Sequence, residues 1–295
     1  MKPSVKKGIF LAILAAGLYA LSSPVSKLLL DYLPSTLMAG FLYIGAGLGM
    51  VLIALLKKRQ ESESRLTVRD LPYTILMVVL DIAAPKCLMF GLSMTTAANA
   101  SLLNSFEIVA TAIIAMLIFG ESISPRLWLG ILFVTLSCAI LSIDDISSFQ
   151  FNTGSLFVLL ACVCWGIENN CSKKLSNRDP LQIVMVKGIC SGIGSVLIGL
   201  ISGERIQFPW VIPVVLLLGF IAYGLSIYYY VYAQRILGAA RTSAYYAVAP
   251  FVGVFLSFII FGEIPGTMFI VALILMIAGV WLSSQDKPLK ETFRR

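Results

Sequence analysis

The sequence predicts an all-α polytopic membrane protein, with ten transmembrane helices arranged as two inverted five-helix repeats (5+5). Three observations predict this fold: the composition, the spacing of the apolar runs, and the distribution of lysine and arginine. Of the 295 residues, 59% are hydrophobic and only 13% are charged, whereas a typical soluble domain is about 25% charged. So few charges cannot cover this much apolar surface in water, and we therefore expect the chain to lie in a lipid bilayer.

Ten apolar runs follow one another along the chain, each close to the ~20 residues that a helix needs to cross the hydrocarbon core. The runs are 8–30, 35–56, 71–94, 96–119, 126–143, 153–174, 181–202, 210–235, 240–262 and 265–283. Transmembrane β-strands would be about half as long and would alternate polar with apolar residues, so the runs indicate helices. The first run is longer than the apolar region of a cleaved signal.

The basic residues predict the orientation. With the N-terminus in the cytoplasm, 18 of the 22 lysines and arginines fall in cytoplasmic segments, and only Arg205 falls in an external loop. Basic residues concentrate on the cytoplasmic side of membrane proteins. We therefore expect a multi-pass protein of the plasma or inner membrane with both termini cytoplasmic. The net charge of +7 follows from this bias and requires no nucleic acid partner. Lys27, near the outer end of the first run, is expected to extend toward the interface.

The two halves of the chain resemble each other. The segment Ile118–Glu121 recurs 142 residues later as Ile260–Glu263, and four residues of the first run and loop recur 146 residues later: Gly8, Ser26, Lys27 and Pro34 as Gly154, Ser172, Lys173 and Pro180. Because each half holds five runs, an odd number, the second half must enter from the opposite face. Many secondary transporters are built from such inverted repeats. We predict one domain at 1–145 and a second, inverted domain at 146–295 that ends in a cytoplasmic tail.

Five ionisable residues lie deep within the runs, where such groups usually mark a cavity or a pathway. We expect Glu168 to pair with Lys187, because the two lie at similar depths on consecutive runs. We expect Lys86 to pair with Glu107, because it lies outward of Glu107 by about the reach of a lysine side chain, on an adjacent run. Asp81 then has no obvious cation. A carboxylate without a cation in a medium of low dielectric constant binds a proton more readily, so Glu107 and Asp81 are candidates for proton coupling. Fixed structural ion pairs are the alternative interpretation.

Helical spacing adds polar and aromatic groups to these charges. Asn104 lies on the same helix face as Glu107, and Trp165 on the same face as Glu168. Tyr223 lies near the middle of its run, where an aromatic ring beside carboxylates can hold an organic cation. Ser22 and Asn170 would add hydrogen bonds. The predicted cavity for a substrate or coupling ion consists of Asp81, Lys86, Asn104, Glu107, Trp165, Glu168, Asn169, Lys187 and Tyr223.

Prolines and glycines predict where helices break or approach closely. Pro24, Pro85 and Pro250 fall inside three runs, and we interpret them as hinges or gates, with simple kinks as the alternative. Small residues cluster at 45–49 and 188–195, which indicates close packing between helices.

Several classes of function are disfavoured. The chain has no histidine, and its six cysteines lie within or at the ends of the runs, so neither a metal site nor a disulfide framework is expected. No phosphate-binding G-x-x-x-x-G-K loop is present, and only one aspartate, Asp81, is deep. We therefore expect no enzyme and no cofactor. The expected partners are a small-molecule substrate, the lipid bilayer and protons, in a monomer or homodimer.

Ten runs, a 5+5 duplication and two Ala-rich runs that end in Phe-Gly-Glu (119–121 and 261–263) resemble the EamA-type members of the drug/metabolite transporter superfamily, over about residues 8–284. The second copy has the mid-run proline of the family pattern, Pro250, whereas the first copy has Ile108 in that place. Glu121 and Glu263 are expected to make capping or loop contacts.

The resemblance implies a central cavity lined by the first, third, fourth, sixth, eighth and ninth runs, with the fifth and tenth runs at the periphery. It also implies the export or exchange of small metabolites, such as amino acids or organic amines, without ATP. We therefore predict a secondary active transporter that works by alternating access. An uncoupled facilitator or channel, and a membrane-embedded enzyme, are the alternatives.

Overall fold

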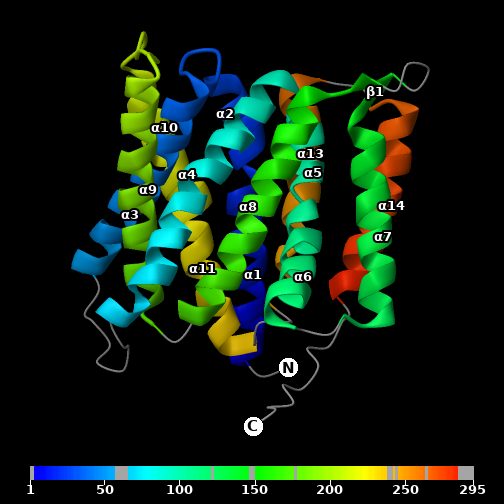
Figure 1. Ribbon diagram of the computed structural model, residues 1–295, viewed down its shortest axis with the longest axis horizontal. Helices are drawn as coiled ribbons and strands as arrows, with labels where there is room; N and C mark the ends of the chain where they lie inside the picture. Colours follow the sequence, from blue (N-terminus) through cyan, green and yellow to red (C-terminus); the bar gives the residue numbers. More distant parts are fainter. Residues whose placement is uncertain are drawn as a thin grey trace.

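The computed structural model describes residues 3–56, 66–120, 123–145, 150–175, 178–237, 242, 245–262 and 265–284. It is a bundle of long helices lying side by side (Figure 1). Its elements are α1 (Pro3–Ala20), α2 (Ser22–Leu29), α3 (Ser35–Leu56), the 3₁₀ turn η1 (Val68–Asp70), α4 (Leu71–Met94), α5 (Ala97–Leu103), α6 (Phe106–Phe119), α7 (Pro125–Leu141), the short strands β1 (Ile143–Asp145) and β2 (Gln150–Phe151), α8 (Thr153–Leu175), α9 (Pro180–Ile201), α10 (Val211–Gly219), the π-helical turn η2 (Phe220–Leu225), α11 (Ser226–Leu237), α13 (Ala249–Phe261) and α14 (Thr267–Ser284).

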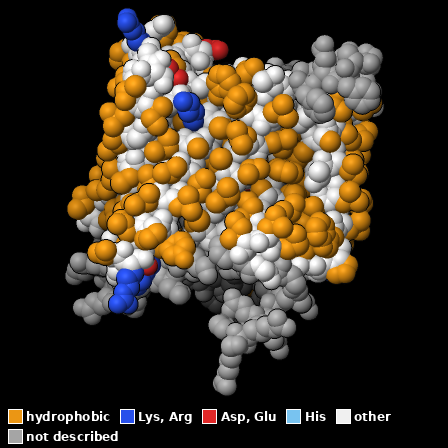
Figure 2. Space-filling view, viewed as in Figure 1, with side chains coloured by type: hydrophobic (Ala, Val, Ile, Leu, Met, Phe, Trp, Pro, Cys, Tyr) orange, Lys and Arg blue, Asp and Glu red, His pale blue; other side chains and the backbone are white. Residues whose placement is uncertain are grey.

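Each of the ten predicted runs corresponds to one helix or to consecutive helical segments. In the described part of the chain, seven segments are long and apolar enough to cross a membrane, and three further apolar helices, in the fifth, ninth and tenth runs, are shorter. Apolar side chains cover most of the face seen in Figure 2, and the blue lysine and arginine side chains lie near its two ends. The chain is therefore a multi-pass membrane protein.

The two ends of the bundle can be named by the segments found there. α1 begins and α14 ends at the lower end in Figure 1, which we call the terminal end. The antiparallel pair β1–β2 lies at the opposite end, which we call the hairpin end. α1 therefore runs away from the terminal end, whereas α8, which follows β2, runs toward it.

Helices of the two halves pack against each other in a regular scheme. α3 packs against α9, α5 against α13 and α7 against α14, so that the second, fourth and fifth runs of each half meet their counterparts. The first and third runs meet crosswise, because α1 packs against α11 and α4 against α8. Exchanging the two halves leaves this scheme unchanged.

Glycines allow the closest of these contacts. A Cβ atom on Gly47 of α3 would lie 2.7 Å from the backbone nitrogen of Ile189 in α9, and one on Gly188 would lie 2.5 Å from the backbone nitrogen of Gly47. Because real Cβ atoms do not approach a backbone so closely, only glycine fits at these positions. The predicted packing role of the small residues at 45–49 and 188–195 is confirmed.

Glycine also ends one helix in each half at the Phe-Gly-Glu motif. α6 ends at Gly120 with φ 64°, and α13 ends at Gly262 with φ 62°. This left-handed conformation favours glycine and terminates a helix. The motif therefore ends a helix at the same point of each repeat. Its glutamates, Glu121 and Glu263, lie outside the described residues.

Three runs are interrupted near their middle. The first breaks between α1 and α2 at Leu21, because Pro24 has no N–H group to donate to the Ala20 carbonyl. The ninth has a turn at residues 247–248, just before Pro250. The fourth breaks at residues 104–105, between α5 and α6, although Ile108 stands in the place of the proline. Pro85 does not break its run, since α4 is continuous, so the predicted interruption there is wrong.

Candidate functional site

A cluster of charged side chains lies in the middle of the bundle. The ammonium group of Lys187, on α9, is 3.0 Å from Oε1 of Glu168, on α8, and 3.3 Å from Oδ2 of Asp81, on α4. Asp81 is 0% exposed and Glu168 is 2% exposed. The predicted pair of Glu168 and Lys187 is confirmed. The expectation that Asp81 has no cation is wrong, because one lysine between α4 and α8 reaches both carboxylates.

Asp81 has a second partner that the sequence did not suggest. The hydroxyl of Tyr43, on α3, donates a hydrogen bond of 3.1 Å to Oδ1 of Asp81. α3 and α4 pack against each other and both contact α9, so the tyrosine and the lysine approach the carboxylate from neighbouring helices. Both oxygens of Asp81 are therefore engaged although its side chain is fully buried.

Glu107, on α6, is bound by an amide and not by the predicted lysine. The side-chain amide of Asn169, on α8, donates a bond of 2.7 Å to Oε1 of Glu107. No described cation lies within 4.0 Å of Glu107, and Lys86 forms no ion pair with it. The predicted Lys86–Glu107 pair is wrong because α8 packs against both α4 and α6, and its side chains meet Glu107 first.

Asn169 and Asn170 connect α8 to α6 at the same level. Asn169 also donates to the hydroxyl of Thr111 at 3.3 Å, and Asn170 donates to the Thr111 and Gly166 carbonyls at 3.1 and 2.8 Å. The Thr111 carbonyl thereby gains a partner from a neighbouring helix. These amides fix the position of Glu107 relative to the Lys187 cluster.

Five tyrosine rings form a continuous chain beside the charges. The distances between successive ring centroids are 5.4 Å from Tyr43 to Tyr223, 5.8 Å from Tyr223 to Tyr19, 6.0 Å from Tyr19 to Tyr246, and 4.8 Å from Tyr246 to Tyr230. Such separations are typical of interacting aromatic pairs. The tyrosine chain joins α1, α3, η2, α11 and the start of the ninth run.

Tyr223 is placed in this chain by an irregular helix. It lies in the π-helical turn η2, which separates α10 from α11, and its hydroxyl is 2.9 Å from Oγ of Ser22 in α2. π-helical turns occur frequently at functional sites. The predicted cavity residue Tyr223 is therefore in contact with Ser22, which was expected to add a hydrogen bond. Trp165 is buried in the same core.

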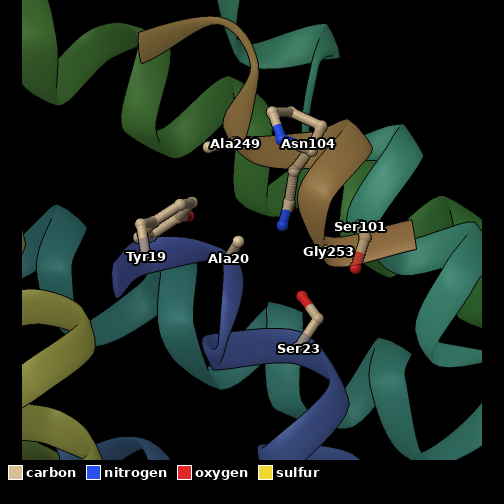
Figure 3. Close-up of a pocket in the computed structure, with 8 residues that line it drawn as sticks. Tyr19, Ala20, Ser23, Ser101, Asn104, Ala249 and Gly253 are labelled. Atoms are coloured by element: carbon tan, nitrogen blue, oxygen red, sulfur yellow. The ribbon is translucent and has the colours of Figure 1, made fainter. Parts of the chain in front are cut away.

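A small pocket lies where the three interrupted runs meet. It is lined by Tyr19, Ala20, Ser23, Ser101, Asn104, Ala249, Pro250 and Gly253. In Figure 3 the side chains of Ser23, Ser101 and Asn104 point into the space between α2, α5 and α13. Asn104 is the one residue of the pocket that was predicted as part of the site, and Pro250 was predicted as a hinge. The pocket is about the size that holds one water molecule.

Sequence reasoning missed Tyr19, Tyr43 and Lys27. The ammonium group of Lys27 donates to the carbonyls of Leu92 and Thr95 at 2.6 and 2.8 Å, at the end of α4. The recurrence of Lys27 as Lys173 was the available signal that this lysine has a definite place in the fold. Tyr43 lies in a run that was not expected to line the cavity.

Comparison with known proteins assigns the chain to a family. The model of the EamA-like transporter family matches residues 6–143 and again residues 152–285. The chain belongs to the EamA-like transporter family. It is therefore a membrane transporter, consistent with the drug/metabolite transporter superfamily.

Similar proteins carry the same description. An uncharacterized transporter of Methanothermobacter thermautotrophicus is 28% identical over 292 residues, which cover 93% of this chain and 85% of that protein. The uncharacterized transporter YyaM of Bacillus subtilis is 21% identical and covers 81% of each chain. A solved crystal structure shares the fold, with a TM-score of 0.66 and 17% identity over 95% of each chain.

Proposed function

We propose that this EamA-family protein is a secondary active exporter or exchanger of small metabolites that carry an amino group, such as amino acids or organic amines. The observation that carries this proposal is the charge of the buried cluster. In the described part of the chain, one ammonium group lies between the carboxylates of Asp81 and Glu168, and a third carboxylate, Glu107, is bound by an amide.

This charge distribution favours cations. A charged residue at the centre of a membrane helix costs about 2.5–3.5 kcal/mol or more, and one lysine offsets only part of the charge of three carboxylates. A proton on Glu107 or Asp81, or the ammonium group of a substrate, would neutralise the excess. A proton and an ammonium group cannot both neutralise the same carboxylate. This competition is the basis on which the protein would exchange protons for an amine.

The tyrosine chain supports an organic cation as the substrate. The face of an aromatic ring attracts a cation with about 0.5–2 kcal/mol, depending on how far water is excluded. Tyr223 and Tyr19 are in the chain that begins at Tyr43, whose hydroxyl binds Asp81. A cation that leaves the carboxylates would therefore meet aromatic faces.

Alternating access between two inverted five-helix repeats is the proposed mechanism. It is supported by the two separate family matches, by the opposite directions of α1 and α8, and by the symmetric packing scheme of the two halves. The breaks in the first, fourth and ninth runs supply positions about which half-helices can turn. We propose Pro24 and Pro250 as two of these hinges.

The test measures transport into liposomes that contain the purified protein. Radiolabelled lysine, leucine and methylammonium are offered separately, with and without a pH gradient, to the wild type and to Glu107→Gln. We expect the pH gradient to drive uptake of at least one amine by the wild type, and Glu107→Gln to lose this response. Asp31→Asn, which changes an exposed carboxylate in the same way, is the matched control.

Two results would contradict the proposal. Flux that ignores both the pH gradient and a counter-substrate would identify an uncoupled facilitator. A Glu107→Gln protein whose response to the pH gradient equals that of the wild type would remove Glu107 from the coupling step.

A further inference from the structure

None of the residues that line the pocket shown in Figure 3 belongs to the ion pairs of Lys187, and none of them is charged. Its polar groups include the hydroxyls of Ser23 and Ser101, the amide of Asn104, and the carbonyl of Ala20, beside the ring of Tyr19. Pro24 cannot donate to that carbonyl, so the last turn of α1 leaves it without its ordinary helical partner. The pocket therefore collects neutral oxygen atoms from three helices.

One of these oxygens is buried without a partner. Ser101 is 4% exposed, and within the described chain its Oγ makes no hydrogen bond. A buried hydroxyl without a partner destabilises a protein by about 1–3 kcal/mol. Such a group, aimed into a pocket, indicates that something binds there.

Gly253 keeps the space beside this hydroxyl open. A Cβ atom at position 253 would lie 2.9 Å from Oγ of Ser101 and 3.4 Å from the carbonyl oxygen of Ala20. A single methyl group would thus occupy the space that both oxygens face. Where α13 passes the pocket, it has a glycine, and the absence of a side chain there leaves the pocket open.

The charges nearby determine the sign of a bound group. The backbone N–H of Glu107 donates to the carbonyl of Asn104 at 3.1 Å, and Glu107 has no described cation within 4.0 Å. In a medium of low dielectric constant, a carboxylate next to a pocket attracts a cation and repels an anion. A divalent ion would require carboxylate ligands, and none lines the pocket.

We propose that this pocket binds a small monovalent cation, with the Ala20 carbonyl and the side-chain oxygens of Ser23, Ser101 and Asn104 as its ligands. The amide of Asn104 can turn its oxygen inward, because the only described contact of Oδ1 is the Sγ of Cys162 at 4.0 Å. Freed carbonyls at the ends of half-helices bind Na⁺ in other transporters. The cation is either a sodium ion or the ammonium group of a substrate, and the inference holds whether or not amines are transported.

The experiment measures the thermal unfolding of purified protein in detergent at constant ionic strength. Separate samples contain NaCl, KCl, methylammonium chloride or choline chloride as the salt. Binding of ²²Na⁺ is measured in parallel. We expect sodium or methylammonium to raise the midpoint temperature saturably above the value in choline, which is too large for the pocket. The salt that raises the midpoint temperature shows whether the bound cation is a sodium ion or the ammonium group of a substrate.

Three variants locate the binding in the pocket. Ser101→Ala removes one ligand and should weaken binding on the order of tenfold. It should not lower the midpoint temperature in choline, because the hydroxyl has no partner to lose. Gly253→Ala should abolish the response. If this variant fails to fold, Ser23→Ala replaces it, with an expected weakening like that of Ser101→Ala.

Matched controls come from the same chain. Ser137→Ala removes a buried hydroxyl from α7, far from the pocket, and Gly17→Ala adds a Cβ atom where nothing lies within 4 Å. Both should keep the response of the wild type. The proposal is overturned if no small cation acts more strongly than choline, or if the response persists in both pocket variants. Transport driven by a pH gradient would be unaffected by that result, so failure here and failure of the proposed function can be told apart.

Discussion

At the scale of single residues, Lys187 decides the state of the central cluster. Its ammonium group is the cation that the structure places against both Asp81 and Glu168. Removing one partner of a buried ion pair leaves an uncompensated charge, which is usually more harmful than never having formed the pair. The two carboxylates therefore depend on this one side chain.

Lys187→Met should lower the stability of the purified protein by about 3–5 kcal/mol, measured by unfolding in detergent. The loss should be smaller when the same change is made in a Glu168→Gln background, because one of the orphaned charges is then gone. Arg205→Met, at an exposed position, should change stability by less than about 0.5 kcal/mol. An equal loss in both backgrounds would show that Lys187 and Glu168 are not coupled.

The residues of the site were only partly accessible from the sequence. Depth along a run identifies which charges are buried, and it correctly joined Glu168 to Lys187. It does not tell which helices are neighbours, so the pairing of Lys86 with Glu107 was wrong and the bonds from Tyr43 and Asn169 were missed. A long lysine side chain that serves two acids cannot be recognised from depth alone.

At the scale of elements, the helix breaks recur in both halves although the residues differ. In the ninth run the break precedes Pro250, whereas in the fourth run it occurs without a proline. There the backbone N–H of Ile108 donates to the Ser105 carbonyl at 3.2 Å, one residue closer than in an α-helix. The prolines in the sequence correctly predicted the helix breaks at Pro24 and Pro250. The same prediction failed at Pro85, because a membrane helix can continue through a proline when the freed carbonyl is satisfied locally.

Ile108→Pro should therefore be tolerated, with a loss of stability of about 1 kcal/mol or less, since only one short backbone bond is removed. The same change at Ile113, in the regular part of α6, should cost about 3 kcal/mol or more. Both are measured by thermal unfolding in detergent. Equal losses at the two positions would show that the fourth run is regular at residues 104–105.

At the scale of the whole molecule, the repeat and the composition predicted most of the architecture. Self-similarity at offsets of 146 and 142 residues and the five runs per half predicted inverted insertion. They could not predict which helices pack together, because contacts between the halves depend on side-chain shape. The glycines of α3 and α9 marked their interface only in general terms, and their actual partners follow from the structure.

Opposite insertion can be tested by labelling in cells. In a protein whose native cysteines have been replaced, Lys6→Cys and Thr153→Cys place a thiol at the terminal end and at the hairpin end, both at exposed positions. A reagent that does not cross membranes should label Thr153→Cys in intact cells, and Lys6→Cys only after lysis. Labelling of both from the same side would contradict the inverted arrangement.

At the hairpin end, two charged side chains bind backbone groups at the ends of helices. Lys27 binds the last carbonyls of α4, and the carboxylate of Glu204 accepts from the backbone N–H groups of Thr36 and Leu37 at the start of α3, at 3.2 and 2.9 Å. In the proposed alternating-access cycle, water would hydrate both charged groups and their backbone partners as soon as they separate. Hydration would then return most of the electrostatic energy that the separation costs, so the proposed opening of this end would require only a small net change in free energy.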